Sequence, residues 1–147
     1  MKNTEQLVRR NASPLARAMM IIGAVQLVLL ILNFYYVLLF LIAGRAWTGA
    51  LITFWVNFAL LWLNTVIGIL WEKQFCNKYF MCREFFWQDV GNLAALLSYI
   101  VYFIGVRQDW DRKRLAASML FAGMVYSINF AQWIYKRMIA RKGHGRG

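Results

Sequence analysis

Four long stretches that hold a single charged residue between them dominate this 147-residue sequence. They cover residues 18–44, 46–71, 85–106 and 115–135, and the one charge inside them is Asp89. Even the shortest, at 21 residues, makes roughly 30 Å of helix, enough to cross the hydrocarbon core of a bilayer. The stretches are continuously apolar and lack the alternation of a membrane strand. The sequence therefore predicts an all-α integral membrane protein, a four-helix bundle.

The length and composition agree with this fold class. Hydrophobic residues make up 61% of the chain, above the roughly 45–50% of soluble domains. Residues 1–147 leave room for four spans and short loops, so we expect a single membrane domain with a loop at 72–84. The first helix is predicted to start at Ser13-Pro14, where the hydroxyl group caps free amides and proline occupies the first position.

Basic residues are distributed unevenly around the predicted spans. Twelve of the 17 Lys and Arg residues flank the N-terminus, the 72–84 loop and the C-terminal tail, whereas five lie in the other two loops. Because cytoplasmic loops are enriched in Lys and Arg, both termini are predicted to be cytoplasmic. This flanking, with attraction to anionic headgroups, also explains the net charge of +11. No nucleic-acid-binding motif accompanies that charge, and no nucleic-acid partner is expected.

Polar residues recur inside the spans at intervals of three, four or seven, which places them on one face of each helix. In lipid, such side chains promote helix association. The four polar seams meet either within one chain or across a homo-oligomer, and packing is the simplest role for their amides. Their members include Gln26, Asn33, Thr53, Asn57, Asn64, Asn92, Tyr99, Tyr102, Tyr126 and Asn129.

Asp89 differs from these amides because a carboxyl group inside a span is costly to ionise. Desolvation favours its protonated form, which makes Asp89 a candidate proton donor. Pairing with Arg83 is the structural alternative.

The segment 71–90 concentrates three carboxylates, three cations and seven aromatic residues at one membrane face. Such aromatic residues often form an interfacial belt. They would equally suit a flat amphipathic ligand, with rings stacked on it and cations meeting its carboxylate. Cys76 and Cys82 lack CxxC spacing and further cysteine partners. No metal site, nucleotide-binding loop or cofactor is therefore expected.

The same segment resembles the vinyl (bacterio)chlorophyllide hydratase family of bacteriochlorophyll biosynthesis. The resemblance rests on Trp71-Glu72-Lys73 and, at a matching separation, Phe85-Phe86-Trp87-Gln88-Asp89-Val90. It extends to Arg9-Arg10-Asn11-Ala12-Ser13 and to Asn129-Phe130-Ala131-Gln132-Trp133, and so covers nearly the whole chain. It implies a cofactor-independent hydro-lyase of a bacterial photosynthetic inner membrane. Such an enzyme adds water across the 3-vinyl group of a chlorophyllide or bacteriochlorophyllide and gives a 1-hydroxyethyl group.

Vinyl hydration needs an acid, a positioned water and a base. We expect Asp89 to be the acid and Glu72 the partner of water, while Glu84 replaces an acid that the family usually has at the position of Gln88. Two further departures are Cys82-Arg83-Glu84 in place of Ala-Pro-Ala and Tyr99 in place of a common histidine. The residues expected to bind the tetrapyrrole are Trp71, Lys73, Arg83, Phe86, Trp87, Gln88, Asn64, Asn92 and Asn129.

Two other functions compete with hydration. A non-enzymatic pigment-binding or photosynthetic-complex assembly subunit would use the same segment without turnover, and the Gln88 departure favours it. A small exporter would place an acid in mid-membrane, but the first, second and fourth spans have none in their interior.

The distribution of basic residues gives a topology prediction. Single cysteines placed at either terminus or at Lys78 should react with a membrane-impermeant reagent from the cytoplasmic side, and cysteines at Arg45 or Trp110 from the other side. Labelling of oriented vesicles measures this. Termini on different sides would mean that one of the four spans is wrong.

Overall fold

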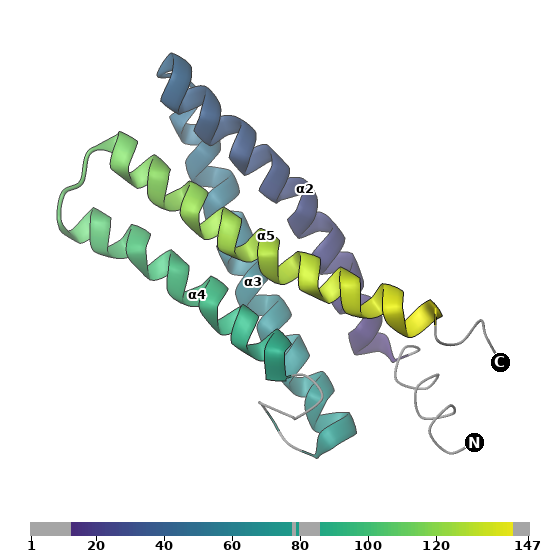
Figure 1. Ribbon diagram of the computed structural model, residues 1–147. Helices are drawn as coiled ribbons and strands as arrows, with labels where there is room; N and C mark the ends of the chain where they lie inside the picture. Colours follow the sequence, from purple (N-terminus) through teal and green to yellow (C-terminus); the bar gives the residue numbers. More distant parts are fainter. Residues whose placement is uncertain (1–12, 78, 80–85, 143–147) are drawn as a thin grey trace. The chain divides into compact units, whose positions relative to one another are not determined.

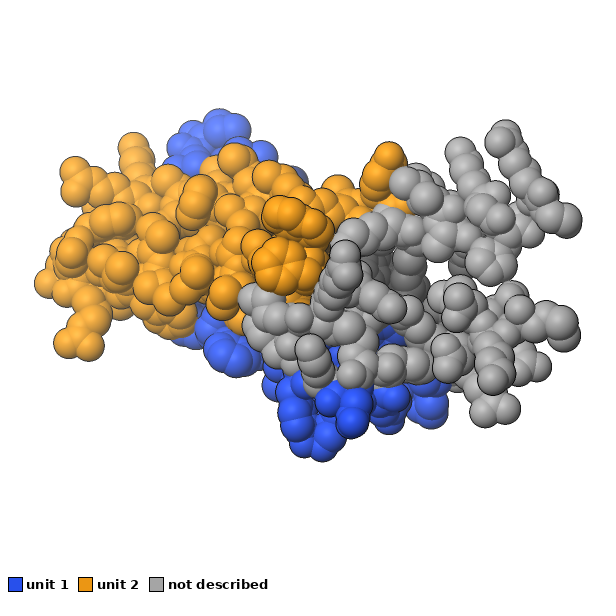
Figure 2. Space-filling model, turned by 60° about the horizontal axis from the view of Figure 1, so that its bottom comes forward, with its two compact units in different colours: residues 1–84 blue, residues 85–147 orange. Residues whose placement is uncertain are grey.

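Four long helices make up the part of the protein that the structure describes. The computed structural model describes residues 13–77, 79 and 86–142, apart from the side chains of residues 75, 76, 133 and 136–142. The helices are α2 (Pro14–Ala43), α3 (Trp47–Cys76), α4 (Phe86–Arg107) and α5 (Arg112–Lys142) (Figure 1). The chain divides into two compact units, residues 1–84 and 85–147, which Figure 2 shows in different colours. Each unit contains one helical hairpin, and the prediction of a single domain stays a prediction.

The ends of α2 follow from local sequence. The Ser13 side chain accepts a hydrogen bond from the Ala16 amide at 3.1 Å, and Pro14 occupies the first helical position. The start predicted at Ser13-Pro14 is confirmed. At the other end Gly44 has a φ of 66°, and its N–H donates to the Phe40 carbonyl at 2.8 Å. This left-handed position, which glycine adopts without strain, ends the helix and begins the turn into α3.

Aromatic rings, a glycine and an amide make successive contacts between α2 and α3, starting from the turn that joins them. Near the turn, the Phe40 and Trp47 rings lie 4.9 Å apart between centroids. One turn further along α2, the Tyr36 ring packs against Gly49 so closely that a Cβ there would lie 3.1 Å from it. These contacts show that the two helices pack along an interface with small residues on α3, as membrane helices commonly do.

A buried amide continues this interface. Asn33 is 3% exposed, and its Nδ2 donates to the Ala50 carbonyl at 3.0 Å and to Thr53 Oγ1 at 2.9 Å. Thr53 in turn donates to the Gly49 carbonyl at 2.8 Å. The Asn33 amide nitrogen and the Thr53 hydroxyl therefore both have partners within the hairpin.

The α4–α5 hairpin turns through a short connection at the left of Figure 1. Asp111 caps α5, since its carboxylate accepts a hydrogen bond from the Arg114 amide at 2.8 Å. The Trp110 amide donates to the Gly105 carbonyl at 2.9 Å, and the Trp110 ring covers Gly105. A side chain at Gly105 would collide with that ring, so the glycine is needed for the turn.

The surface of the helices reverses the usual soluble pattern. Gln26, Asn33 and Asn57 are buried, whereas Ile21, Ile42 and many other large apolar residues are exposed. All four helices are long and apolar enough to cross a membrane. Apolar residues outside and amides inside are what a lipid environment favours. The fold is thus all-helical over the described residues, as predicted, and has the length and composition of a membrane protein.

Helix α3 extends beyond the uncharged interval 46–71 from which it was predicted. The segment 72–84 was expected to be a loop, but α3 continues through Glu72 and Lys73 to Cys76 and ends at Asn77, which has a φ of 54°. Charge marks where a span leaves the lipid, not where a helix ends, and nothing between 72 and 76 breaks a helix. The first residues of the expected loop therefore form the last turn of α3.

The Asn33 contacts generate a stability prediction. Asn33→Leu keeps the volume but removes both hydrogen bonds across the α2–α3 hairpin. We expect the free energy of unfolding to fall by about 1 kcal/mol, the scale of interhelical hydrogen bonds in membranes. Denaturant unfolding in mixed micelles measures it. Ile31→Leu, on the exposed face of the same helix, is the control and should change nothing; an unchanged Asn33→Leu would contradict the structural role.

Candidate functional site

Two groups of predicted site residues lie at the ends of α3 and α4, one in each unit. On α3, consecutive residues point in three directions because each residue turns the helix by about 100°. Trp71 is half-buried, Glu72 is 5% exposed and Lys73 is exposed. The Lys73 ammonium donates to the Tyr79 hydroxyl and lies 4.0 Å from the centre of the Tyr79 ring. The end of α3 thus presents a cation outward and a carboxyl group inward.

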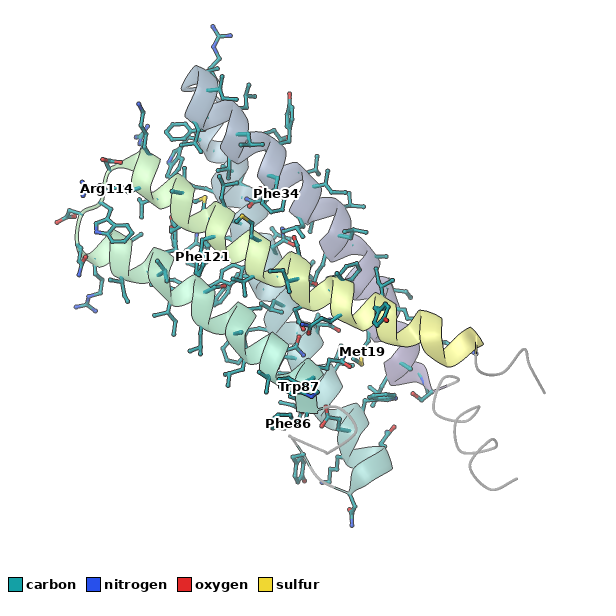
Figure 3. All side chains as sticks on the ribbon, viewed as in Figure 1. Met19, Phe34, Phe86, Trp87, Arg114 and Phe121 are labelled. Atoms are coloured by element: carbon teal, nitrogen blue, oxygen red, sulfur yellow. The ribbon has the colours of Figure 1, made fainter. Side chains whose placement is uncertain are left out.

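The first turn of α4 repeats this arrangement. Phe86 and Trp87 are exposed, with ring centroids 5.5 Å apart in an edge-on geometry. Figure 3 shows both at the start of α4, and Arg114 at the opposite end of the same hairpin. Gln88 is half-buried and Asp89 is 4% exposed. Two aromatic rings therefore face outward while the carboxyl group one turn along faces the protein.

Asp89 shares a helix face with Asn92, three residues further along α4. Asn129 of α5 donates from Nδ2 to Asn92 Oδ1 at 2.7 Å. Asn129 is itself buried, and its Oδ1 accepts no hydrogen bond from the described residues. The sequence predicted both asparagines as site residues, and the structure brings them together.

Gly91 makes this pairing sterically feasible, and the sequence analysis missed it. A Cβ at Gly91 would lie 2.8 Å from Asn129 Cγ and closer still to Oδ1. Asn129 therefore lies against bare backbone of α4. The available signal was a glycine in mid-helix next to a polar seam, where glycine lowers helix stability and so needs a packing reason.

Two buried phenols continue the seam into the hairpin. Tyr99 on α4 and Tyr126 on α5 are 3% and 4% exposed. Their side chains interact electrostatically, which places them in the same interior region. Both belong to the predicted seams, and Tyr99 stands at the position where the family resemblance implies a histidine.

Not every predicted site residue joins these groups. Asn64 lies eight residues before Glu72 on α3, about 12 Å of helix, and pairs with Gln26 of α2 instead. Arg83 and Glu84 lie outside the described residues, as do Cys82 and the proposed pairing of Arg83 with Asp89. Within the described part of the chain, no group of three or more His, Cys, Asp and Glu residues comes together as a metal site would require.

The comparison with protein families tests the resemblance that the sequence suggested. The family model for 2-vinyl bacteriochlorophyllide hydratase (BCHF) matches residues 3–139. The chain belongs to this family. The resemblance inferred from the 71–90 segment is therefore confirmed, and every predicted site residue lies within the match.

Two curated relatives carry the same name. The 2-vinyl bacteriochlorophyllide hydratase of Rhodobacter capsulatus is 26% identical over 137 residues, which cover 93% of this chain and 80% of the relative. The protein of that name from Cereibacter sphaeroides is also 26% identical over 137 residues, covering 93% of this chain and 86% of the relative. No solved structure matches the chain.

The Gly91 contact gives a second stability prediction. Gly91→Ala should displace the Asn129 amide and lower the free energy of unfolding by about 1–2 kcal/mol, the usual effect of a steric clash in a packed interior. The double variant Gly91→Ala/Asn129→Ala should be no less stable than Asn129→Ala alone, because the clashing group is gone.

Gly68→Ala is the matched control, since a Cβ there meets only the Met19 methyl group at an ordinary 3.6 Å. Denaturant unfolding compares the four variants. If the Gly91→Ala effect persists undiminished in the double variant, the clash with Asn129 is not its cause.

Proposed function

We propose that this chain is a hydratase of bacteriochlorophyll biosynthesis that adds water across the vinyl group of a bacteriochlorophyllide or chlorophyllide. The observation that carries the proposal is the family match over residues 3–139. The buried Asp89, one turn from a hydrogen-bonded asparagine pair, supports it chemically. The product is the 1-hydroxyethyl derivative.

Asp89 is the proton donor in this proposal. As a neutral carboxylic acid, it gives its proton to the terminal carbon of the vinyl group, and the inner carbon becomes a cation that the conjugated ring stabilises. Its place inside the apolar interval 85–106 supports the neutral form, whereas Glu72, which is equally buried, lies beyond the end of the interval 46–71. Asn92 and Asn129 orient the reacting groups, since the Asn129 oxygen has an acceptor site that no described donor occupies.

Glu72 is the base. The oxygen of water bonds to the inner carbon, and the Glu72 carboxylate accepts the proton that this water releases. One proton leaves Asp89 and one arrives at Glu72, so the cycle closes when a proton returns through solvent. Only residues 77–85 connect α3 to α4, and this short connection between consecutive spans supports both carboxyl groups serving one substrate at one membrane face.

The pigment lies in the membrane interface. The exposed Phe86 and Trp87 rings and the half-buried Trp71 contact the macrocycle, with Gln88 at its edge. Lys73 and Arg83 hold its propionate. Because the positive-inside pattern favours a cytoplasmic location for this end of the hairpins, the active face is cytoplasmic and both termini lie on that side.

The direct test is turnover. Membranes containing the protein should add one water mass to vinyl bacteriochlorophyllide or vinyl chlorophyllide, without added nucleotide or metal and in the presence of a chelator. Asp89→Asn keeps the side-chain shape but removes the acid. It should bind pigment normally and lose on the order of 10²–10⁴ in turnover, the usual scale of general acid–base assistance.

Controls separate the carboxyl groups. Asp109→Asn makes the same change at an exposed turn residue with a φ of 52°, a conformation that asparagine tolerates, and should leave turnover unchanged. Glu72→Gln should also be slow. Normal turnover of Asp89→Asn with a collapsed rate in Glu84→Gln would move the acid role to Glu84, and pigment binding without any turnover of the unmodified protein would favour a pigment-binding subunit.

A further inference from the structure

A group of three amides with buried polar atoms lies within the α2–α3 hairpin, outside the site groups described above. Gln26 is fully buried and Asn57 is 2% exposed. Asn64 Nδ2 donates to Gln26 Oε1 at 3.4 Å. We call Gln26, Asn57 and Asn64 the amide cluster.

Contacts on either side of Gln26 fix its level against α3. Asn33 lies seven residues after Gln26 and bonds to Thr53. Met19 lies seven residues before it, with its methyl group 3.6 Å from the place of a Cβ at Gly68. Because α2 and α3 are antiparallel, Gln26 therefore lies opposite the middle of the α3 segment between Thr53 and Gly68. The two asparagines of the cluster lie within about one turn of that midpoint.

Several hydrogen-bond donors and acceptors of the amide cluster have no partner within the described part of the hairpin. Gln26 Nε2, both amide atoms of Asn57 and Asn64 Oδ1 are buried and have no partner among the described residues. These are two nitrogens and two oxygens. If the side-chain amide of Asn57 is turned by 180°, so that its nitrogen and oxygen change places, the number of unpaired nitrogens and oxygens stays the same. The same holds if the amides of the bonded Gln26–Asn64 pair are turned together. Asn33 shows the contrast, since its amide nitrogen bonds to α3 directly.

The depth of the cluster makes these atoms costly to leave unpaired. Each of its residues lies at least eight positions along its helix from the nearest charged residue, about 12 Å along the axis. No bulk water reaches such a depth in lipid, where an unpaired amide is strongly disfavoured. A bound group that both donates and accepts is therefore required.

We propose that the amide cluster is a water-binding site inside the membrane, and that its water is the reserve from which the hydration reaction draws. Water donates two hydrogen bonds and accepts two, matching the two oxygens and two nitrogens. A ketone or ester carbonyl of the pigment only accepts and would leave both oxygens without a donor. The reserve role rests on the proposed function, whereas the binding of water does not.

The path from the cluster to the base supports the reserve role. Asn64, Gly68 and Glu72 follow at intervals of four on one face of α3. Gly68 carries no side chain, so the space between the amide and the carboxyl group is filled by the Met19 methyl group, the end of a flexible side chain that can move aside. Water released from the cluster thus meets Glu72 about two turns further along the same helix.

Nuclear magnetic resonance of the unmodified protein in nanodiscs tests the binding of water. Side-chain amide hydrogens of Gln26 and Asn57 should show cross-peaks to the water resonance, assigned by their loss in Gln26→Leu and Asn57→Leu. Asn33 is the internal control and should show none. Cross-peaks from Asn57 to another side chain, to lipid or, in mixed-label samples, to a second copy, with none to water, would overturn the proposal.

Turnover tests the reserve role separately. Asn57→Leu should lower kcat by about tenfold or more, as expected when a reactant loses its position, and leave KM for the pigment unchanged. Asn57→Ser keeps a hydroxyl group that binds water, so its kcat should lie between those of Asn57→Leu and the unmodified protein. It replaces Asn57→Leu in the test if that variant does not fold. Asn33→Leu should keep wild-type turnover per folded molecule. Wild-type kcat in Asn57→Leu overturns the reserve, whereas an unmodified protein without hydratase activity overturns the proposed function and leaves the water measurement standing.

Discussion

The absence of water from the lipid interior is the constraint on which the rest of this structure depends. Backbone groups meet it by forming helices throughout each span. Side chains meet it by position, because isoleucines such as Ile21 and Ile42 cover the outside while amides such as Gln26 are buried. Within each hairpin the buried polar groups then have to find partners, and their success differs from place to place. The Asn33 nitrogen has two partners, Asn129 is paired on one side, and the Asn57 amide has no hydrogen-bond partner among the described residues.

This graded pairing separates structural amides from candidate functional ones. An amide whose nitrogen already donates twice, such as that of Asn33, holds two helices together and has no donor left for a ligand. Asn129 keeps a buried oxygen without a donor among the described residues and bonds to Asn92, one helical turn from Asp89, which is a favourable place to orient a reactant. The seams therefore contain both kinds of residue, and sequence spacing alone does not distinguish them.

The sequence was sufficient to predict the four spans because lipid excludes charge so strongly that uncharged intervals mark them. It also predicted the polar face of each helix, since that face depends only on helical periodicity. It did not predict that α3 continues through Cys76, because the charges of Glu72 and Lys73 end the span without ending the helix. Gly91 was missed for a different reason. Its importance lies in the distance between two backbones and an amide, which spacing along one helix does not encode.

In the proposed mechanism, the position of Asp89 meets two opposing demands on a proton donor. A donor must be shielded enough to remain protonated, yet it must recover a proton from water in every cycle. In mid-span, recovery would be slow, and in the aqueous loop the carboxyl group would ionise. The first turn of α4 satisfies both demands, since Asp89 is buried there while Phe86 and Trp87, within one turn, are exposed at the end of the span. Gln88 beside it is neutral and adds no second negative charge to this turn. Asp89 can therefore be the only acid here if Glu72 accepts the proton from water.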